Sequence, residues 1–441
     1  MKKLFLVLAA ALLVLAFSGC SVYETDTESL MRPPLMSEEQ EKLNEALSKV
    51  AGENYTLKYP ETGETNSAFV FKDLDMDGNK EAMAFYSSVD ESTRINILKK
   101  EGDGWVSVYE AAGFSGEIKS IDFAEMDKNG TVLLVKWDDR IGVYRYKNNR
   151  LETIYSGNSS GATIADINKD GYSDIVVFKE TDMNRSLFSV IYSDGAEVLM
   201  TEDISVHAQF DSIMSAKTAK LNSEKTAYFI DSVIYEGVYL TEIITLEEGE
   251  LKRHTLADFV DYEEEEEEEP SENSGTIIII GGNLGKRGIF LRNTAVSCMD
   301  TNKDGIMEFP VEVREDYAKE KNSNIYYLQY MQVAEETAYP VWNGVANSEN
   351  GYLFALPIQW NDRVTPSFNS LNNELVFSET ETGKVVFKIC MVQKSDYQDK
   401  YEDYTLAAED GTRNFYAKSF VEPETPFYLE PEQYENFFIF I

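Results

Sequence analysis

Histidine is almost absent from this 441-residue sequence, which contains only His207 and His254. Two isolated histidines exclude the HExxH zinc motif and multi-histidine metal clusters. No GxSxG segment occurs either, so the commonest signal of a serine hydrolase is missing. The glycine-rich segment GGNLGKRG, which begins at Gly281, has too few residues between its glycines for a phosphate-binding loop.

Cysteine and basic residues are also scarce. After Cys20 only Cys298 and Cys390 remain, which excludes a disulfide scaffold and favours two buried free thiols, with a bond between them as the alternative. The 78 acidic residues outnumber the 40 Lys and Arg residues, giving a net charge of −38. Such a surface repels phosphate, so nucleic acid is excluded as a partner and cations are favoured.

The one long apolar run lies near the start of the sequence, from Leu4 to Phe17, after two lysines. It is too short to span a bilayer and is typical of a secretory signal. The following segment, LAFSGC, resembles the bacterial lipobox, except that Phe17 stands where Leu is usual. The resemblance implies a signal peptide at 1–19, lipid on Cys20, and anchoring to the extracytoplasmic face of the cell membrane. Secretion with an unmodified Cys20 is the alternative.

Residues 20–36 contain two prolines and are expected to form a tether. Ser37 and Gln40 then match a capping box, and Gly52 is a helix-stop signal. The spacing therefore predicts a short N-terminal helix with Leu43, Leu47 and Val50 on one face, packed on the region that follows.

From about residue 55 to 330 the sequence predicts short β-strands, including 82–86, 132–137 and 175–178. Five segments share a repeat unit: DLDMDGNKE from Asp73, EMDKNGTVL from Glu125, DINKDGYSD from Asp166, KLNSEKTAY from Lys220 and DTNKDGIME from Asp300. After each of the first four, further strands and a tight polar turn follow. Units of several strands whose starts are spaced as these are along the sequence are typical of propeller blades. We therefore expect a mainly β fold, with a propeller-like array of about five repeat blades within residues 37–340.

Two further regions interrupt or follow the repeats. An acidic insert at about 259–274 contains seven consecutive glutamates, Glu263–Glu269, and is expected to be an extended solvated loop. After about residue 345 the repeat pattern stops, which predicts a small C-terminal antiparallel β (α+β) domain at 345–441. Its expected strands are 351–360, 374–377 and 385–392, with a short helix at 431–438.

Three of the repeat loops carry oxygen donors at positions 1, 3, 5 and 9 and glycine at position 6. Alternate carboxylates in a tight loop converge on one point, glycine supplies a positive φ, and the carbonyl of position 7 adds a ligand, which together suit calcium. The predicted ligand sets are Asp73, Asp75, Asp77, Asn79 and Glu81; Asp166, Asn168, Asp170, Tyr172 and Asp174; and Asp300, Asn302, Asp304, Ile306 and Glu308.

These loops are not EF-hands, because position 12 is Ala84, Val177 or Val311 and a strand follows. The pattern resembles the FG-GAP and VCBS repeats of integrin-type propellers, and SGATIADINKDGYSDIVVF is the nearest match. The resemblance covers residues 66 to about 330. It implies that each calcium loop joins neighbouring strands of one blade.

The other two loops depart from the pattern. Leu133 occupies the ninth position of the second loop, so calcium binding there is expected to be weak or absent. In the fourth loop Lys220, Lys225 and Tyr228 replace the first acid, the glycine and the ninth ligand. We expect that loop to be metal-free, with Lys220 supplying a fixed positive charge. Cys298 precedes the fifth loop at a position that faces the blade core, which predicts a packed thiol.

The sequence therefore favours a cell-surface, lipid-anchored, calcium-stabilised binding or interaction protein whose ligand is a glycan or a protein. The alternative is a surface hydrolase or lyase acting on polysaccharide on a propeller scaffold. That alternative requires two carboxylates at catalytic separation, which a sequence with 78 acids leaves open. The missing catalytic motifs favour a non-enzymatic function.

Overall fold

The computed structural model describes residues 37–52, 54–88, 91–128, 130–181, 186–235, 237–254, 290–312, 324–334, 337–396 and 401–441. The expected signal peptide 1–19, Cys20, the tether and the acidic insert lie outside the described residues. The described chain is mainly β, as predicted, with six antiparallel sheets and one α-helix. Within these residues we find no helix long and apolar enough to cross a membrane.

The N-terminal helix, α3 (Glu38–Ala51), begins with the predicted capping box. Ser37 Oγ accepts the Gln40 N–H at 3.2 Å, and Gln40 Oε1 accepts the Ser37 N–H at 3.0 Å. The helix packs on the outer face of the first sheet through Leu43, Ala46 and Leu47. The assignment of Val50 to this face was wrong, because Val50 is 52% exposed and Ala46 takes its place.

The first four sheets each contain one of the first four repeat units. The first sheet consists of β1 (Thr56–Leu57), β2 (Phe69–Lys72), β3 (Glu81–Ser87), β4 (Ser92–Glu101) and β5 (Gly104–Ser115). The second consists of β6 (Ser120–Asp127), β7 (Gly130–Lys136), β8 (Arg140–Lys147) and β9 (Arg150–Asn158). The third consists of β10 (Gly161–Ala165), β11 (Asp174–Glu180), β12 (Ser186–Ser193), β13 (Val198–Met200) and β14 (Ile204–Val206). The fourth, preceded by the 3-10 helix η1 (Phe210–Ser212), consists of β15 (Ile213–Lys220), β16 (Thr226–Tyr235), β17 (Val238–Glu247), β18 (Glu250–His254) and β19 (Phe290–Arg292).

The fifth and sixth sheets complete the array. The fifth consists of β20 (Phe309–Glu312), β21 (Ile325–Ala334), β22 (Thr337–Asn347), β23 (Tyr352–Ala355) and β29 (Phe438–Phe440). The sixth consists of β24 (Val364–Asn369), β25 (Glu374–Glu379), β26 (Val385–Gln393), β27 (Thr405–Glu409) and β28 (Arg413–Ser419). Two 3-10 helices flank the sixth sheet, η4 (Ile358–Trp360) and η6 (Pro431–Phe437), and η6 lies at the predicted short helix.

The domain boundary expected at 340–345 falls within a single strand, β22. This strand pairs with β21 on one side and β23 on the other, and β29 then pairs with β23. The fifth sheet therefore takes strands from both sides of the expected boundary. The repeat motif ends with the loop that precedes β20, so the motif itself does not show which of the later strands join this sheet.

Successive sheets share hydrophobic cores because their second strands are buried on both faces. In β7, Leu133 and Val135 pack toward the first sheet, whereas Val132 and Leu134 pack toward the third. Side chains on a strand alternate between its two faces, so such a strand reads as a continuous apolar run. Each fully buried side chain of this size contributes about 1.5 to 3 kcal/mol to folding.

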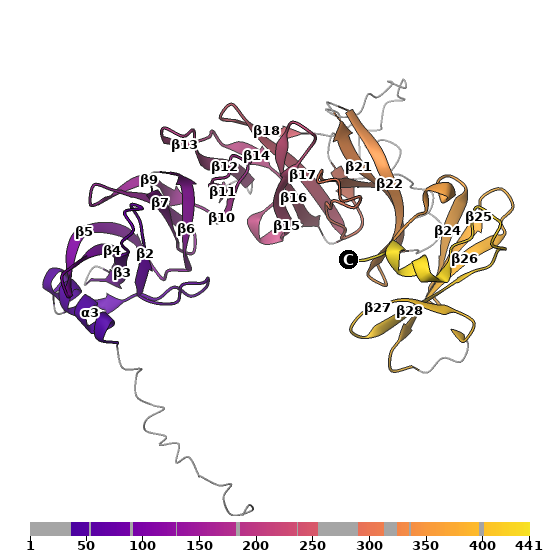
Figure 1. Cartoon of the computed structure of the whole chain (residues 1–441), viewed down its shortest axis with the longest axis horizontal. Helices are drawn as coiled ribbons and strands as arrows, with labels where there is room; N and C mark the ends of the chain where they lie inside the picture. The colour runs from indigo at the N-terminus through magenta and orange to yellow at the C-terminus, as the bar shows by residue number, and fades with distance from the viewer. Residues whose placement is uncertain are drawn as a thin grey trace, which may run out of the picture.

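Figure 1 shows the six sheets one after another along an arc, with α3 at one end and the sixth sheet at the other. Hydrophobic clusters join each sheet to the next along this arc. None of the clusters formed by the described residues joins the first sheet to the fifth or sixth. The described sheets therefore form an open row and not a closed ring. A repeat pattern encodes contacts between neighbouring units, and these contacts are satisfied without closure.

The fourth strand of the third and fourth sheets is interrupted in the same way. In the third sheet β13 and β14 both pair with β12, and residues 201–203 connect them. In the fourth sheet β18 and β19 both pair with β17, where His254 lies opposite Ile243 and Phe290 lies opposite Thr241. The chain thus leaves and re-enters this sheet at neighbouring positions, and the acidic insert falls between them.

Candidate metal centres

Four of the five repeat loops join two paired strands of one sheet, and the fifth precedes the first strand of its sheet. The first joins β2 to β3, the second β6 to β7, the third β10 to β11 and the fourth β15 to β16. The fifth ends at Glu308, directly before β20, and Met299 pairs with Glu308 across its base. The loops therefore occupy equivalent positions, as the sequence predicts.

The first, third and fifth loops share one backbone conformation. The glycine at position 6 has a φ near +90° in each, and position 4 also has a positive φ. In each loop that glycine donates its N–H to Oδ2 of the Asp at position 1. The distances are 2.9 Å from Gly78 to Asp73, 3.2 Å from Gly171 to Asp166 and 3.0 Å from Gly305 to Asp300. The predicted role of the glycine is confirmed.

The ninth-position acid closes each of these loops from the following strand. Its carboxylate accepts the N–H of position 2, at 2.9 Å for Glu81, 2.8 Å for Asp174 and 2.6 Å for Glu308. All three residues are buried. Burial raises the pKa of each of these three carboxyl groups. For Asp174 the nearby charges of Asp170 and Asp166 raise it further, and its pKa reaches about 7. A nearby cation would favour the ionised form of these acids.

Each loop also keeps one buried carboxylate oxygen that accepts no hydrogen bond among the described residues. These atoms are Oδ1 of Asp75, Oδ1 of Asp166 and Oδ1 of Asp300. In the first loop Asp73, Asp75 and Glu81 bring one oxygen each to within 4.8 Å of one another, and Asp300, Asp304 and Glu308 do so in the fifth. The third-loop carboxylates are not grouped this closely. A buried anionic oxygen without a donor is costly, and a bound cation would compensate it.

A side chain from a neighbouring strand reaches into two of these loops, Lys99 from β4 and Gln332 from β21. Lys99 Nζ lies 2.9 Å from Asp75 and 3.2 Å from Glu81 in the first loop. In the fifth loop Gln332 Nε2 donates to Asp304 at 2.9 Å and to Glu308 at 3.3 Å. Sequence reasoning missed both residues. Ala82 pairs with Leu98 and Phe309 pairs with Met331, so the next residues, Lys99 and Gln332, lie opposite the ninth-position acids. Only the strand register identifies them.

The second and fourth loops are tighter hairpins. Asp127 pairs with Gly130 across the second loop, and the Asp127 carboxylate forms an ion pair with Arg145 of β8. In the fourth loop Lys220 pairs with Thr226. Lys225 also forms an ion pair there, because its Nζ lies 3.1 Å from Glu247, and the expected role of Lys220 as a fixed charge stays a prediction. At both hairpins, therefore, a basic side chain of the protein itself pairs with an acidic one.

The complete loops also connect neighbouring sheets through their backbones. The carbonyl of Leu74 in the first loop accepts the Thr131 N–H of the second sheet at 3.0 Å. Ser173 at the end of the third loop donates to the Glu125 carbonyl at 2.9 Å, and Met307 in the fifth loop donates to the Lys220 carbonyl at 2.9 Å. An ion that fixed such a loop would also fix the junction between two sheets.

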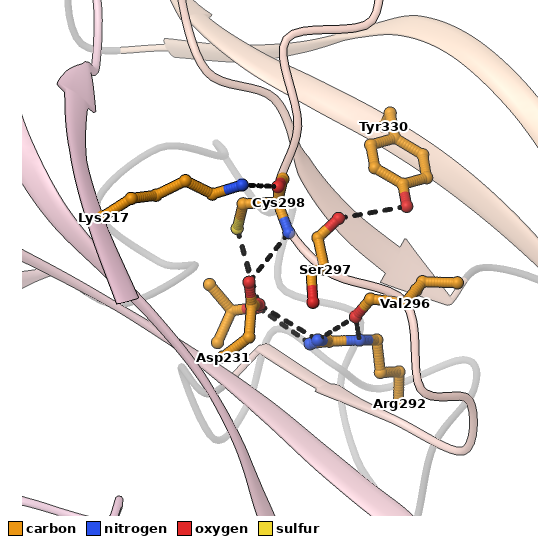
Figure 2. Close-up of polar contacts among 8 residues, drawn as sticks. Lys217, Asp231, Arg292, Val296, Ser297, Cys298 and Tyr330 are labelled. Carbon is orange, nitrogen blue, oxygen red and sulfur yellow. Dashed lines mark hydrogen bonds and ion pairs between the residues drawn. The ribbon is translucent and has the colours of Figure 1, made fainter. Parts of the chain in front are cut away.

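Figure 2 shows a different polar cluster, enclosed between the fourth and fifth sheets. Asp231 of β16 and Arg292 of β19 are fully buried and form an ion pair at 3.0 Å. Asp231 also accepts hydrogen bonds from Thr241 Oγ1 at 2.6 Å and from the Cys298 N–H at 2.9 Å. Arg292 Nε donates to the Val296 carbonyl at 2.8 Å. These residue types are common in active sites, but the side chains of Asp231 and Arg292 are closed to solvent.

The cluster holds the segment before the fifth loop from both sides. Lys217 of β15 donates to the Cys298 carbonyl at 2.6 Å, and Tyr330 of β21 donates to the Ser297 carbonyl at 3.2 Å. Burial, together with the charge of Asp231, raises the pKa of the Cys298 thiol and disfavours the nucleophilic thiolate. Cys298 is a packed thiol, as predicted, and neither Cys298 nor the buried Cys390 forms a disulfide.

Comparison with known proteins does not extend these observations. No protein-family model matches the chain, and no curated protein sequence matches it significantly.

Proposed function

We propose that this protein is a lipid-anchored binding protein of the cell surface, whose FG-GAP/VCBS-like repeat array is stabilised by calcium in three of its five loops. The observation that carries the proposal is the shared geometry of the first, third and fifth loops. Each has the same hydrogen-bond frame and one buried carboxylate oxygen without a donor. At the two loops that lack the ligand pattern, Arg145 pairs with Asp127 and Lys225 pairs with Glu247.

Calcium suits this donor set better than other common ions. Each loop offers carboxylates, side-chain or backbone carbonyl oxygens, and no histidine or thiolate. Calcium accepts six to eight such oxygens in irregular geometry, whereas magnesium requires a near-ideal octahedron. Extracellular calcium modules typically bind with dissociation constants of about 0.1 to 1 mM. We therefore expect modest affinity and easy removal by chelators.

Titration calorimetry on the calcium-stripped, detergent-solubilised protein tests this proposal. Three loops predict a stoichiometry near three, and magnesium should give a much weaker signal. The absence of calcium binding up to several millimolar would overturn the calcium assignment. It would leave the lipid anchor to be tested separately.

The proposed anchor is tested through Cys20. Two acyl chains hold a protein stably at a membrane, and none of the helices of the described residues could replace them as a span. Replacing Cys20 by Ala should move the protein from the membrane fraction to the soluble extracytoplasmic fraction. A Cys20→Ala protein that stays on the membrane after washing in high salt would contradict the anchor.

A further inference from the structure

A cavity of about 640 Å³ opens beside the third loop and extends over three sheets. Its walls come from the β6–β7 turn, the third loop, the β12–β13 turn and the β17–β18 turn. These four turns belong to the second, third and fourth sheets. The open row of sheets therefore forms a groove that no single repeat unit could provide.

The side chains that line this groove share a chemical character. Two are tyrosines, Tyr172 and Tyr192, and Tyr172 is 41% exposed. The exposed carboxylates of Asp170, Asp194 and Glu248 also face it. Among the described residues that line the groove there is no Lys, Arg or His. Such a surface repels anionic ligands and attracts a cation, to which tyrosine rings add a cation–π contribution.

The groove has a fixed shape on its fourth-sheet side. Gly249, in the β17–β18 turn, has a φ of +84°, and a Cβ at this position would lie 2.4 Å from Tyr192 Oη. The turn therefore depends on glycine both for its conformation and for the close approach of Tyr192. Asp194 is fixed as well, because its Oδ1 accepts the N–H groups of Ala196 and Glu197, both at 2.8 Å.

We propose that this groove binds a basic peptide segment, with a lysine or arginine side chain held between the tyrosine rings and the carboxylates. The inference names a ligand class for the binding function proposed above and rests on it. Asp170 belongs both to the third loop and to the groove, so ion and peptide share one side chain. Asp194 and Glu248 lie outside the loop, so both carboxylates stay available to a peptide when the loop binds calcium.

Fluorescence anisotropy with a labelled tetralysine peptide, at physiological salt and in calcium, tests the proposal. The Asp194→Asn/Glu248→Gln double variant should weaken binding about tenfold, because charge-assisted hydrogen bonds are lost. A control double variant, Glu381→Gln/Glu424→Gln, makes the same charge change at exposed positions around the sixth sheet and should change binding less than about twofold. Tyr172→Ala should weaken binding about threefold, and the control Tyr59→Ala, at a tyrosine that is 53% exposed, should not.

Equal losses in the two double variants would overturn the proposal, because they would assign binding to the overall negative charge. Binding of a neutral oligosaccharide such as maltotetraose without binding of tetralysine would also overturn it, in favour of a glycan. Calcium calorimetry on the same variants separates the two proposals. An unchanged calcium stoichiometry with lost peptide binding supports the groove, whereas peptide binding without any calcium binding would refute only the calcium assignment.

Discussion

The third loop and the second loop occupy equivalent positions in neighbouring sheets but balance their charge differently. In the third loop the buried Asp174 has acidic neighbours and a pKa raised to about 7, and no basic side chain pairs with it among the described contacts. In the second loop the buried Asp127 forms an ion pair with Arg145. One unit has an internal cation, and in the other we propose that calcium takes this place.

The same contrast runs along the row of sheets, since the first, third and fifth loops are complete and the second and fourth are closed hairpins. Each complete loop hydrogen-bonds to a closed hairpin unit beside it. If calcium binds as proposed, each ion-dependent loop therefore lies beside a unit whose stability does not depend on the ion. The fifth loop resembles the third, whereas the first is intermediate, because Lys99 already reaches its carboxylates.

The largest effect is expected from removing the internal cation of the second loop. Arg145→Met would leave the buried Asp127 charge uncompensated, which costs about 3 to 5 kcal/mol. Urea denaturation should show this loss equally with and without calcium. Arg150→Met, at an exposed position in the same hairpin, should have little effect. If calcium restored the stability of the Arg145→Met variant, the distinction between the two kinds of loop would be wrong.

A smaller, calcium-dependent loss is expected in the third loop. An ion that binds only the folded state raises the free energy of unfolding by about 2.7 kcal/mol when its free concentration is a hundredfold above Kd. Asp170→Ala removes a central ligand and should forfeit most of that gain, whereas Glu224→Ala in the closed fourth loop should change stability by less than about 0.5 kcal/mol. Thermal unfolding in calcium and in chelator measures both effects. Equal shifts for the two variants would contradict the ligand assignment.

Without calcium, the third loop should also make stability depend on pH. The pKa of Asp174 is raised to about 7 in the folded protein, above its unfolded value, so the folded state binds the proton more tightly. The chelated protein should therefore become more stable as the pH falls from about 8 to 6, and Asp174→Asn should reduce this gain. Thermal unfolding in chelator across this range checks it. Identical pH profiles for the wild type and the variant would refute the assignment.

Lys99 allows a finer test of the first loop. Its ammonium group lies where it competes with an ion for Asp75 and Glu81. Lys99→Met should tighten calcium binding at this loop by about threefold to tenfold, because a like charge is removed. The neighbouring Lys100→Met is the matched control, since Lys100 pairs with Glu39 outside the loop. Calorimetry that gives equal affinities for the two variants would show that Lys99 does not compete.

The smallest effect is expected from the acidic insert. Its flanking strands, β18 and β19, pair with adjacent positions of β17, as β13 and β14 do with β12 across a three-residue connection. Deleting Glu263–Glu269 should therefore change the melting temperature by less than about 2 °C. A decrease of several degrees would show that these glutamates contribute to the packed array.

Short-range patterns predicted much of this structure. These patterns depend only on neighbouring residues. They are the Ser37 capping box, the loop glycines and the polar turns before Trp105, Arg150, Ala196 and Leu251, and the structure has hairpins at these turns. Three of the predicted ligands come together in the first loop and three in the fifth for the same reason, because they are close in sequence.

Contacts across strands and between sheets were not predictable in this way. Lys99, Arg145 and Gln332 reach the loops from other strands, and their roles follow from register. Asp231 and Arg292 form their buried pair across the acidic insert, where no periodicity connects them. The open row of sheets follows from the packing of whole units, which a repeat length does not specify.

The pairing of β29 with β23 also sets an order of assembly. β29 follows the whole sixth sheet in the chain, yet it pairs with a strand that precedes that sheet. While the chain folds in sequence order, the outer edge of β23 therefore stays without its partner until the whole sixth sheet has emerged and β29 follows. An unpaired strand edge is a template for aggregation. Folding of this protein should thus be most vulnerable to aggregation before β29 pairs with β23, when the other five sheets can already be complete.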